Sequence, residues 1–249
     1  MPIAGRVAVC VVLCCSAIAA ACSGRVLKPQ YEYEEELYLD LDGSATLNVN
    51  ASVPALVALH GVDLPTDARA RLDRDRVRAL FAHHGSDVAL STSRRDGRRF
   101  IHVSVEVDDV RKLAQMRPFV WSTYRLRRDS DRIDFIQTVG RSSAGDVGEV
   151  GWDGSELIAF RMHVPSEILF HNSAAGVRRG NILEWEQPLS ARTRGEPLEL
   201  RVQMAPESIL QTTLILFGST IVAAALSLAG IVWWLARRGR QTDVAESSV

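Results

Sequence analysis

The sequence YEYEEELYLDLDGSATLNVNASV, residues 31–53, decides the fold class of this chain. Apolar and polar residues alternate on both sides of Asp42 and Gly43, as expected for two strands that each bury one face. An Asp-Gly pair favours a type I′ turn, in which both central residues have positive φ. The segment therefore predicts a β-hairpin.

The same pattern predicts two further hairpins downstream. Residues 87–107 alternate around a second Asp-Gly pair at Asp96 and Gly97, and residues 121–139 are the third candidate. Additional strands are predicted over residues 156–165, 181–188 and 197–204.

Three helical segments are predicted between these strands. They cover residues 54–61, residues 66–85 and residues 107–116, and Thr66 and Gly85 are the expected N-cap and stop of the second. Several hairpins combined with two or three helices predict an α+β fold. In this fold an antiparallel sheet is covered by helices on one face.

Residues 1–21 have the layout of a secretory signal peptide. One charge at Arg6 precedes an apolar core, and small residues lead up to Cys22. Small residues directly before a cysteine resemble the lipobox of bacterial lipoproteins, in which that cysteine is acylated and becomes the first residue of the mature chain. We therefore predict lipidation of Cys22. Ala19 stands where Leu is usual, so cleavage without lipid at the same site stays an alternative.

Residues 212–236 predict a transmembrane helix, because they are apolar over the length of about 20 residues that spans a hydrocarbon layer. Trp233 and Trp234 lie near the end of this segment, and three arginines follow closely. By the positive-inside rule, residues 237–249 form a cytoplasmic tail and residues 22–208 an extracytoplasmic domain. The chain is predicted to be a single-pass protein of the bacterial inner membrane.

Composition and motifs exclude several functions. The chain has 29 basic and 30 acidic side chains, so no excess of positive charge favours nucleic acid. The sequence patterns of zinc proteases, serine hydrolases, phosphate loops and dinucleotide-binding turns are absent. The six histidines are scattered without metal-ligand spacing. We predict that the protein is not an enzyme and uses no cofactor and no metal.

A short motif carries a resemblance to a known family. A strand ends at a proline, a turn contains asparagine, and a Gly-Asn pair precedes a strand with tryptophan. The residues concerned are Pro165, His171, Asn172, Gly180, Asn181, Leu183 and Trp185. In this order, with a leader before them and an apolar helix after them, they resemble the LppM-domain family of bacterial lipoproteins and membrane-anchored envelope proteins. The resemblance implies an α+β extracytoplasmic domain that binds lipids or glycolipids, and it implies no catalysis.

Two functions remain as hypotheses. In the first, the domain is a binding module that holds a lipid or glycolipid close to the membrane. The candidate walls of this ligand site are Trp121, Phe135, Phe160, Phe170 and Trp185. In the second, the domain is an assembly protein that docks on another envelope component, and its own side chains fill the interior. Turn formation at Gly180 and Asn181, with Trp185 in the core, explains the motif without a ligand.

Overall fold

The computed structural model describes residues 31–82, 88–143 and 145–246. The predicted signal peptide and Cys22 lie outside the described residues. The elements run in chain order as β1 (Tyr31–Leu39), β2 (Ala45–Ser52), α2 (Val53–His60), α3 (Arg74–Phe81), β3 (Val88–Arg95), β4 (Arg98–Val107), η1 (Val110–Gln115), η2 (Arg117–Phe119), β5 (Ser122–Arg128), β6 (Ile133–Val139), β7 (Leu157–His163), β8 (Ser166–His171), β9 (Ile182–Pro188), α4 (Leu189–Thr193), β10 (Leu198–Ser208) and α5 (Ile209–Glu246).

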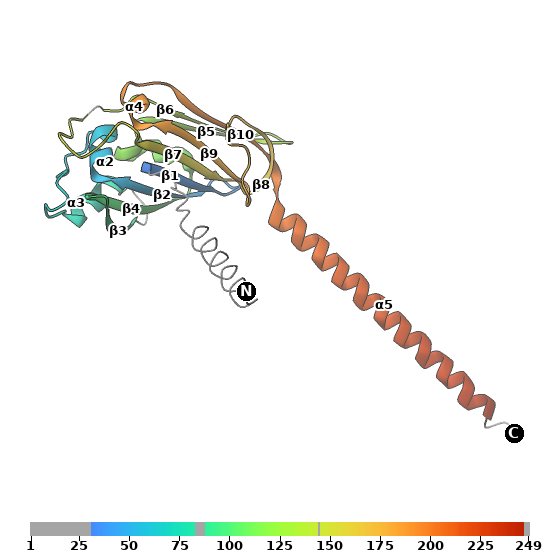
Figure 1. The fold of residues 1–249 in the computed structure, drawn as a ribbon. Coiled ribbons are helices and arrows are strands. Elements are labelled where there is room, and N and C mark those ends of the chain that lie inside the picture. Colours follow the sequence, from blue (N-terminus) through green and yellow to red (C-terminus); the bar gives the residue numbers. More distant parts are fainter. Residues whose placement is uncertain (1–30, 83–87, 144, 247–249) are drawn as a thin grey trace, which may run out of the picture. The chain divides into compact units, whose positions relative to one another are not determined.

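The α+β fold is confirmed, and its strands form two sheets rather than one. The larger sheet has the order β3-β4-β2-β1-β7-β9, and the smaller has the order β5-β6-β10-β8 (Figure 1). Neighbouring strands pair antiparallel except for β1 and β7, which are parallel. The parallel pair joins the first strand of the domain to a strand far along the chain, which local sequence patterns do not predict.

Apolar side chains from both sheets form one core. Leu47 and Phe160 come from the larger sheet, Phe135 and Val202 from the smaller, and Leu59 from α2. Each of these side chains is almost fully buried. Over most of β1, β2 and β4, buried residues alternate with residues that face outward, so the larger sheet has one apolar face and one polar face.

The two Asp-Gly turns differ from each other. Asp96 has φ 51° and Gly97 has φ 73°, so the predicted type I′ geometry is confirmed there. The same prediction is wrong for the first hairpin, where Gly43 has φ 97° and Asp42 does not have positive φ. Gly43 N–H donates to the Asp40 carbonyl at 3.0 Å, which makes a longer loop. The Asp42 carboxylate accepts from the Ser44 N–H at 2.9 Å, and this local bond stabilises the longer loop.

Helix α2 forms where it was predicted, but α3 begins later than predicted. Its N-cap is Asp73 and not Thr66, because the Asp73 carboxylate accepts from the N–H groups of Asp75 and Arg76 at 3.0 and 3.1 Å. The predicted stop, Gly85, lies outside the described residues. The third predicted helix is a short 3₁₀ helix, η1.

The domain ends with strand β10, which pairs with β8 and continues into helix α5. Strand β8 was not predicted, since only the turn at its end was recognised. Within the described residues, α5 is the one helix whose length and apolar composition would allow it to cross a membrane, over Thr213–Trp234 with a mean hydropathy of 2.2.

Candidate functional site

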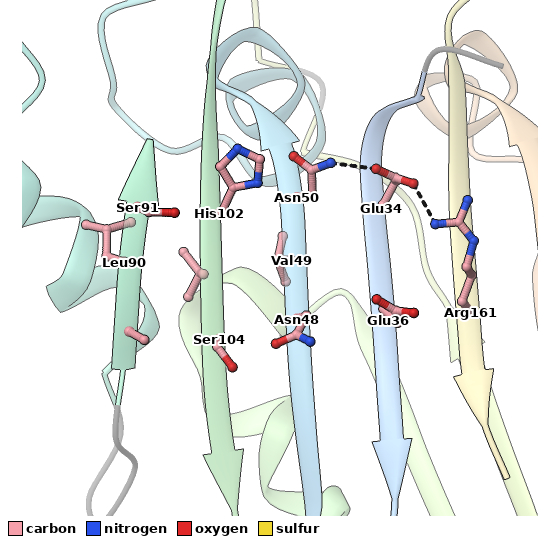
Figure 2. A pocket seen from close by; sticks show the side chains of 12 residues that line it. Glu34, Glu36, Asn48, Val49, Asn50, Leu90, Ser91, His102, Ser104 and Arg161 are labelled. Atoms are coloured by element: carbon pink, nitrogen blue, oxygen red, sulfur yellow. Dashed lines mark hydrogen bonds and ion pairs between the residues drawn. The ribbon is translucent and has the colours of Figure 1, made fainter. Parts of the chain in front are cut away.

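The outward face of the larger sheet carries the candidate site, a shallow hollow of about 380 Å³ (Figure 2). We call it the sheet hollow. Strands β1, β2, β3, β4 and β7 contribute to it, and most of the side chains are polar. Its lining residues are Glu34, Glu36, Asn48, Val49, Asn50, Ala89, Leu90, Ser91, His102, Val103, Ser104 and Arg161.

Strand register brings these polar side chains into two rows across the sheet. In the first row, Glu34 is opposite Asn50, Asn50 is opposite His102, and His102 is opposite Ser91. Side chains of directly opposed residues lie close enough to interact. This row therefore places a carboxylate, an amide, an imidazole and a hydroxyl side by side, although their residues are far apart in the sequence.

The second row lies two residues further along each strand. Asn48 on β2 is opposite Glu36 on one side and Ser104 on the other. Arg161 on β7 is opposite Glu36. Carboxylate, amide and guanidinium groups supply both acceptors and donors over a short distance.

Arg161 is the central charge of the site. Its Nη1 donates to Glu34 Oε1 at 2.6 Å, and its Nε donates to Glu184 Oε2 at 2.6 Å (Figure 2 shows the contact with Glu34). Burial lowers the pKa of Arg161, but the hydrogen bonds to Glu184 and Glu34 outweigh burial and raise the pKa above its ordinary value. Asn50 Nδ2 donates to the second oxygen of Glu34 at 2.6 Å. The carboxylate of Glu34 is therefore held in one orientation from two sides.

At the edge of the hollow, the lining residue Glu36 forms a second polar pair with His163. His163 Nε2 lies 2.7 Å from Glu36 Oε1. The imidazole ring stacks on Tyr38 with ring centroids 3.9 Å apart and an interplanar angle of 14°. Desolvation and the nearby Glu36 raise the pKa of the Tyr38 hydroxyl. Tyr38 and His163 thus stack on each other from neighbouring strands at the same outward face.

The five predicted wall residues do not line one cavity wall. Phe135 and Phe160 are buried in the core, and Trp121 packs against Phe160 with ring centroids 6.4 Å apart. Trp185 is 6% exposed. Phe170 is 48% exposed and lies on β8, the edge strand of the smaller sheet. A ligand role for these residues stays a prediction.

Asn172, one of the motif residues, holds three strands together. Its Oδ1 accepts from Trp185 Nε1 and from the Arg201 N–H, each at 2.9 Å. Its Nδ2 donates to the Glu199 carbonyl at 2.8 Å. Asn172 directly follows β8, Trp185 is on β9, and Arg201 is on β10. The asparagine therefore connects the two sheets at one edge of the core.

The remaining motif residues have related structural positions. Gly180 and Asn181 have φ 88° and 56°, so the predicted turn with positive φ is confirmed. Asn181 Nδ2 donates to the Ser166 carbonyl at 2.9 Å. Leu183 is fully buried, Pro165 directly precedes β8, and His171 is the last residue of β8. In the structure these motif residues therefore form a turn, stabilise it by a hydrogen bond and contribute to the core.

Glu35 is a buried acid that sequence reasoning missed. It lies on the inner face of β1 and is 2% exposed. Burial raises its pKa to about 7, although hydrogen bonds from the Tyr33 hydroxyl and from Gln137 lower it in part. The alternation over residues 31–39 could have indicated this burial, because it places Glu35 on the same face of the strand as Tyr33 and Leu37.

The residues of the sheet hollow were also missed. Five strands provide them, and no short motif links Glu34, Asn50, His102 and Arg161. Polar residues at outward positions are common on solvated sheet faces. Within the described residues, no group of three or more His, Cys, Asp or Glu side chains is arranged to hold a metal ion.

No protein-family model and no curated protein matches this chain. Among solved structures, the chain is similar to the NMR structure of the folded domain of LppM from Mycobacterium tuberculosis. The TM-score is 0.39 and the sequence identity is 12%, and the match covers 73% of this chain and 94% of that chain. This likeness is weak in both measures and assigns no family to the chain.

Proposed function

We propose that this chain is a membrane-anchored binding protein of the bacterial cell envelope. Its domain binds a lipid or glycolipid, and the polar headgroup of that ligand occupies the sheet hollow. The observation that carries the proposal is the hollow of about 380 Å³, lined from five strands, on a domain whose last strand leads into an apolar helix. Small-molecule pockets have volumes of about 300–1,000 Å³.

The chemistry of the hollow favours a headgroup with many hydroxyls. The amides of Asn48 and Asn50 each offer donors and an acceptor, and the carboxylates of Glu34 and Glu36 accept hydrogen bonds. A hydroxyl can donate and accept, so it can satisfy either kind of group. The Tyr38 ring, which stacks on His163 beside the hollow and is 38% exposed, can contact the apolar face of a sugar ring.

The charge of the hollow disfavours a phosphate headgroup. Arg161 is the lining cation, but its charge is already paired with the carboxylates of Glu34 and Glu184 through Nη1 and Nε. Glu36 adds a second carboxylate to the lining. A phosphate at this position would meet two carboxylates and a guanidinium that is already paired. We therefore propose an uncharged or cationic polyhydroxyl headgroup.

The anchor is the apolar segment of α5, Thr213–Trp234. The predicted signal peptide and the arginines that follow the apolar segment support an extracytoplasmic domain, a cytoplasmic tail and an inner-membrane location. The proposal contains no chemical step on the ligand and no resident cofactor or metal. Docking on another envelope component remains the alternative prediction from the sequence.

Lipids that copurify with the full chain test the proposal. The chain is purified in a detergent without a sugar headgroup, and its bound lipids are identified by native mass spectrometry. We expect a bound lipid with a polyhydroxyl headgroup, and we expect the double variant Asn48→Ala/Asn50→Ala to lose it. The matched control is Thr46→Ala, which changes an outward residue on the same strand outside the hollow. A chain without bound lipid, or a double variant that retains it, would contradict the proposal.

A further inference from the structure

Strand β8 exposes two adjacent apolar side chains, Leu169 and Phe170. Their exposed fractions are 51% and 48%. In a regular strand, neighbouring side chains point to opposite faces. The pairing with β10 is irregular here, because Phe170 is opposite Gln203 while Ile168 is opposite Met204. Leu169 is therefore the extra residue of a β-bulge, a feature that redirects side chains.

These residues belong to the strand that begins beside the start of α5, and they lie toward its other end. Ser166, the first residue of β8, is opposite Ser208, the last residue of β10. Ser208 is followed directly by Ile209, where α5 begins. The turn at Asn181 is fixed to the same place by its hydrogen bond to the Ser166 carbonyl. This end of the domain is therefore the end from which the chain enters the apolar helix.

Phe170 lies within reach of a membrane that contains this helix. Its partner Gln203 is separated from Ser208 by about 17 Å of strand, at about 3.3 Å per residue. The first residues of α5, up to Thr213, add about 1.5 Å each, which gives an upper limit of about 25 Å. A tilt of the domain can bring the exposed apolar pair to the lipid surface.

We propose that Leu169 and Phe170 insert into the headgroup region of the membrane that α5 spans. This contact places the domain against the bilayer rather than at a distance from it. The inference rests on the proposed membrane anchor. It is a contact with the lipid surface and is separate from the ligand site in the sheet hollow.

Two features favour a lipid surface over a second copy of the chain. First, a bulge on an edge strand disturbs the regular row of hydrogen-bonding groups that another strand would need for pairing. Second, β10, the partner of β8, continues into the apolar helix, so a membrane that holds this helix lies within about 25 Å of the pair in every molecule. Apolar side chains gain free energy when they leave water for the acyl boundary.

The contact is apolar rather than electrostatic. Near this end of the domain Glu167 and Glu207 are exposed, as is Arg179, and Arg178 is paired with Glu184 at 2.7 Å. These charges give no net positive surface for anionic lipids. The contact should therefore form on uncharged phosphatidylcholine and persist at high salt.

Photo-crosslinking tests this contact in the full chain. Phe170 is replaced by the photoreactive residue p-benzoylphenylalanine, and the protein is reconstituted in phosphatidylcholine vesicles. A half-exposed aromatic position accepts this substitution without disturbing the core.

The matched control carries the same photoreactive residue at Val120, which is 65% exposed. Val120 lies near Ser122, the first residue of β5. Ser122 pairs with Val139, and Val139 pairs with Leu198, so Val120 lies near the end of β10 that is far from α5. A positive control carries it at Phe217 within the apolar helix.

We expect lipid adducts at positions 170 and 217, with a yield at 170 on the order of tenfold above that at 120, at low and high salt. Adducts at 217 without adducts at 170 would overturn the inference and leave the anchor intact. Adducts between two protein chains at 170 would overturn it in favour of self-association. Absence of lipid adducts at 217 would overturn both the anchor and the contact.

Discussion

Gln137 Nε2 donates a hydrogen bond of 3.2 Å to Oε2 of Glu35, and this contact joins the two sheets across the core. Glu35 belongs to β1 of the larger sheet, and Gln137 belongs to β6 of the smaller sheet. Both side chains are buried. The Tyr33 hydroxyl donates to the other oxygen of Glu35. A titratable group therefore lies between the sheets, where ionisation costs free energy.

The Glu35 carboxyl makes domain stability depend on pH. Burial raises its pKa to about 7, whereas an unfolded glutamate ionises near about 4.3. Between these values the folded protein binds a proton that the unfolded chain has released, so the free energy of unfolding falls as pH rises. The fall levels off above the folded pKa and totals on the order of 4 kcal/mol. Urea unfolding of the full chain in detergent, at several pH values, measures this slope.

The variant Glu35→Gln removes the ionisable group and keeps its shape. We expect this variant to lose most of the slope between about pH 4.5 and about pH 7. An unchanged slope in Glu35→Gln would show that another group is responsible.

Asn172 provides a graded test of the contact between β8, β9 and β10. Asn172→Ala leaves the buried Trp185 Nε1 without its acceptor, so we expect a loss of about 1–3 kcal/mol in the free energy of unfolding. Asn172→Asp keeps an acceptor for Trp185 and loses the donor to the Glu199 carbonyl, so its loss should be smaller. Thermal unfolding followed by circular dichroism compares the two variants. Equal losses would mean that the Trp185 contact contributes little.

Two glycines separate steric crowding from backbone strain. A Cβ at Gly140 would lie 2.4 Å from the Trp121 carbonyl oxygen, so Gly140→Ala requires the backbone to move. A Cβ at Gly97 has nothing within 4 Å, and its cost comes from φ 73° alone. We expect about 1 kcal/mol for Gly97→Ala and a larger loss for Gly140→Ala. Denaturant midpoints measured side by side decide the order, and the reverse order would contradict the packing at Gly140.

Local patterns in the sequence predicted the hairpins, the short helix α2 and the apolar helix, because each depends on neighbouring residues. Asp96 and Gly97 formed the expected turn. Asp42 did not, because its carboxylate bonds the Ser44 backbone and stabilises a longer loop. The start of α3 was misplaced for a similar reason, since Thr66 and Asp73 are both acceptable caps by residue type.

Long-range pairing could not be predicted from these patterns. The parallel pairing of β1 with β7 and the division into two sheets depend on contacts between distant segments. The sheet hollow depends on the same pairing, since it places Arg161 beside Glu34. Two of the aromatic residues that the sequence suggested as ligand walls, Phe135 and Phe160, instead fill the core.

Amide hydrogen exchange of the full chain measures ligand binding at the sheet hollow most directly. The chain is kept in an amine-oxide detergent, and a diacylglycerol with an uncharged sugar headgroup is compared with phosphatidylglycerol. The sugar lipid is predicted to slow exchange around residues 34–36, 48–50 and 102–104, and this protection should be absent in Asn48→Ala/Asn50→Ala and retained in Thr46→Ala. Unchanged exchange in these segments with the sugar lipid, or equal protection by phosphatidylglycerol, would contradict a polyhydroxyl headgroup site on this face.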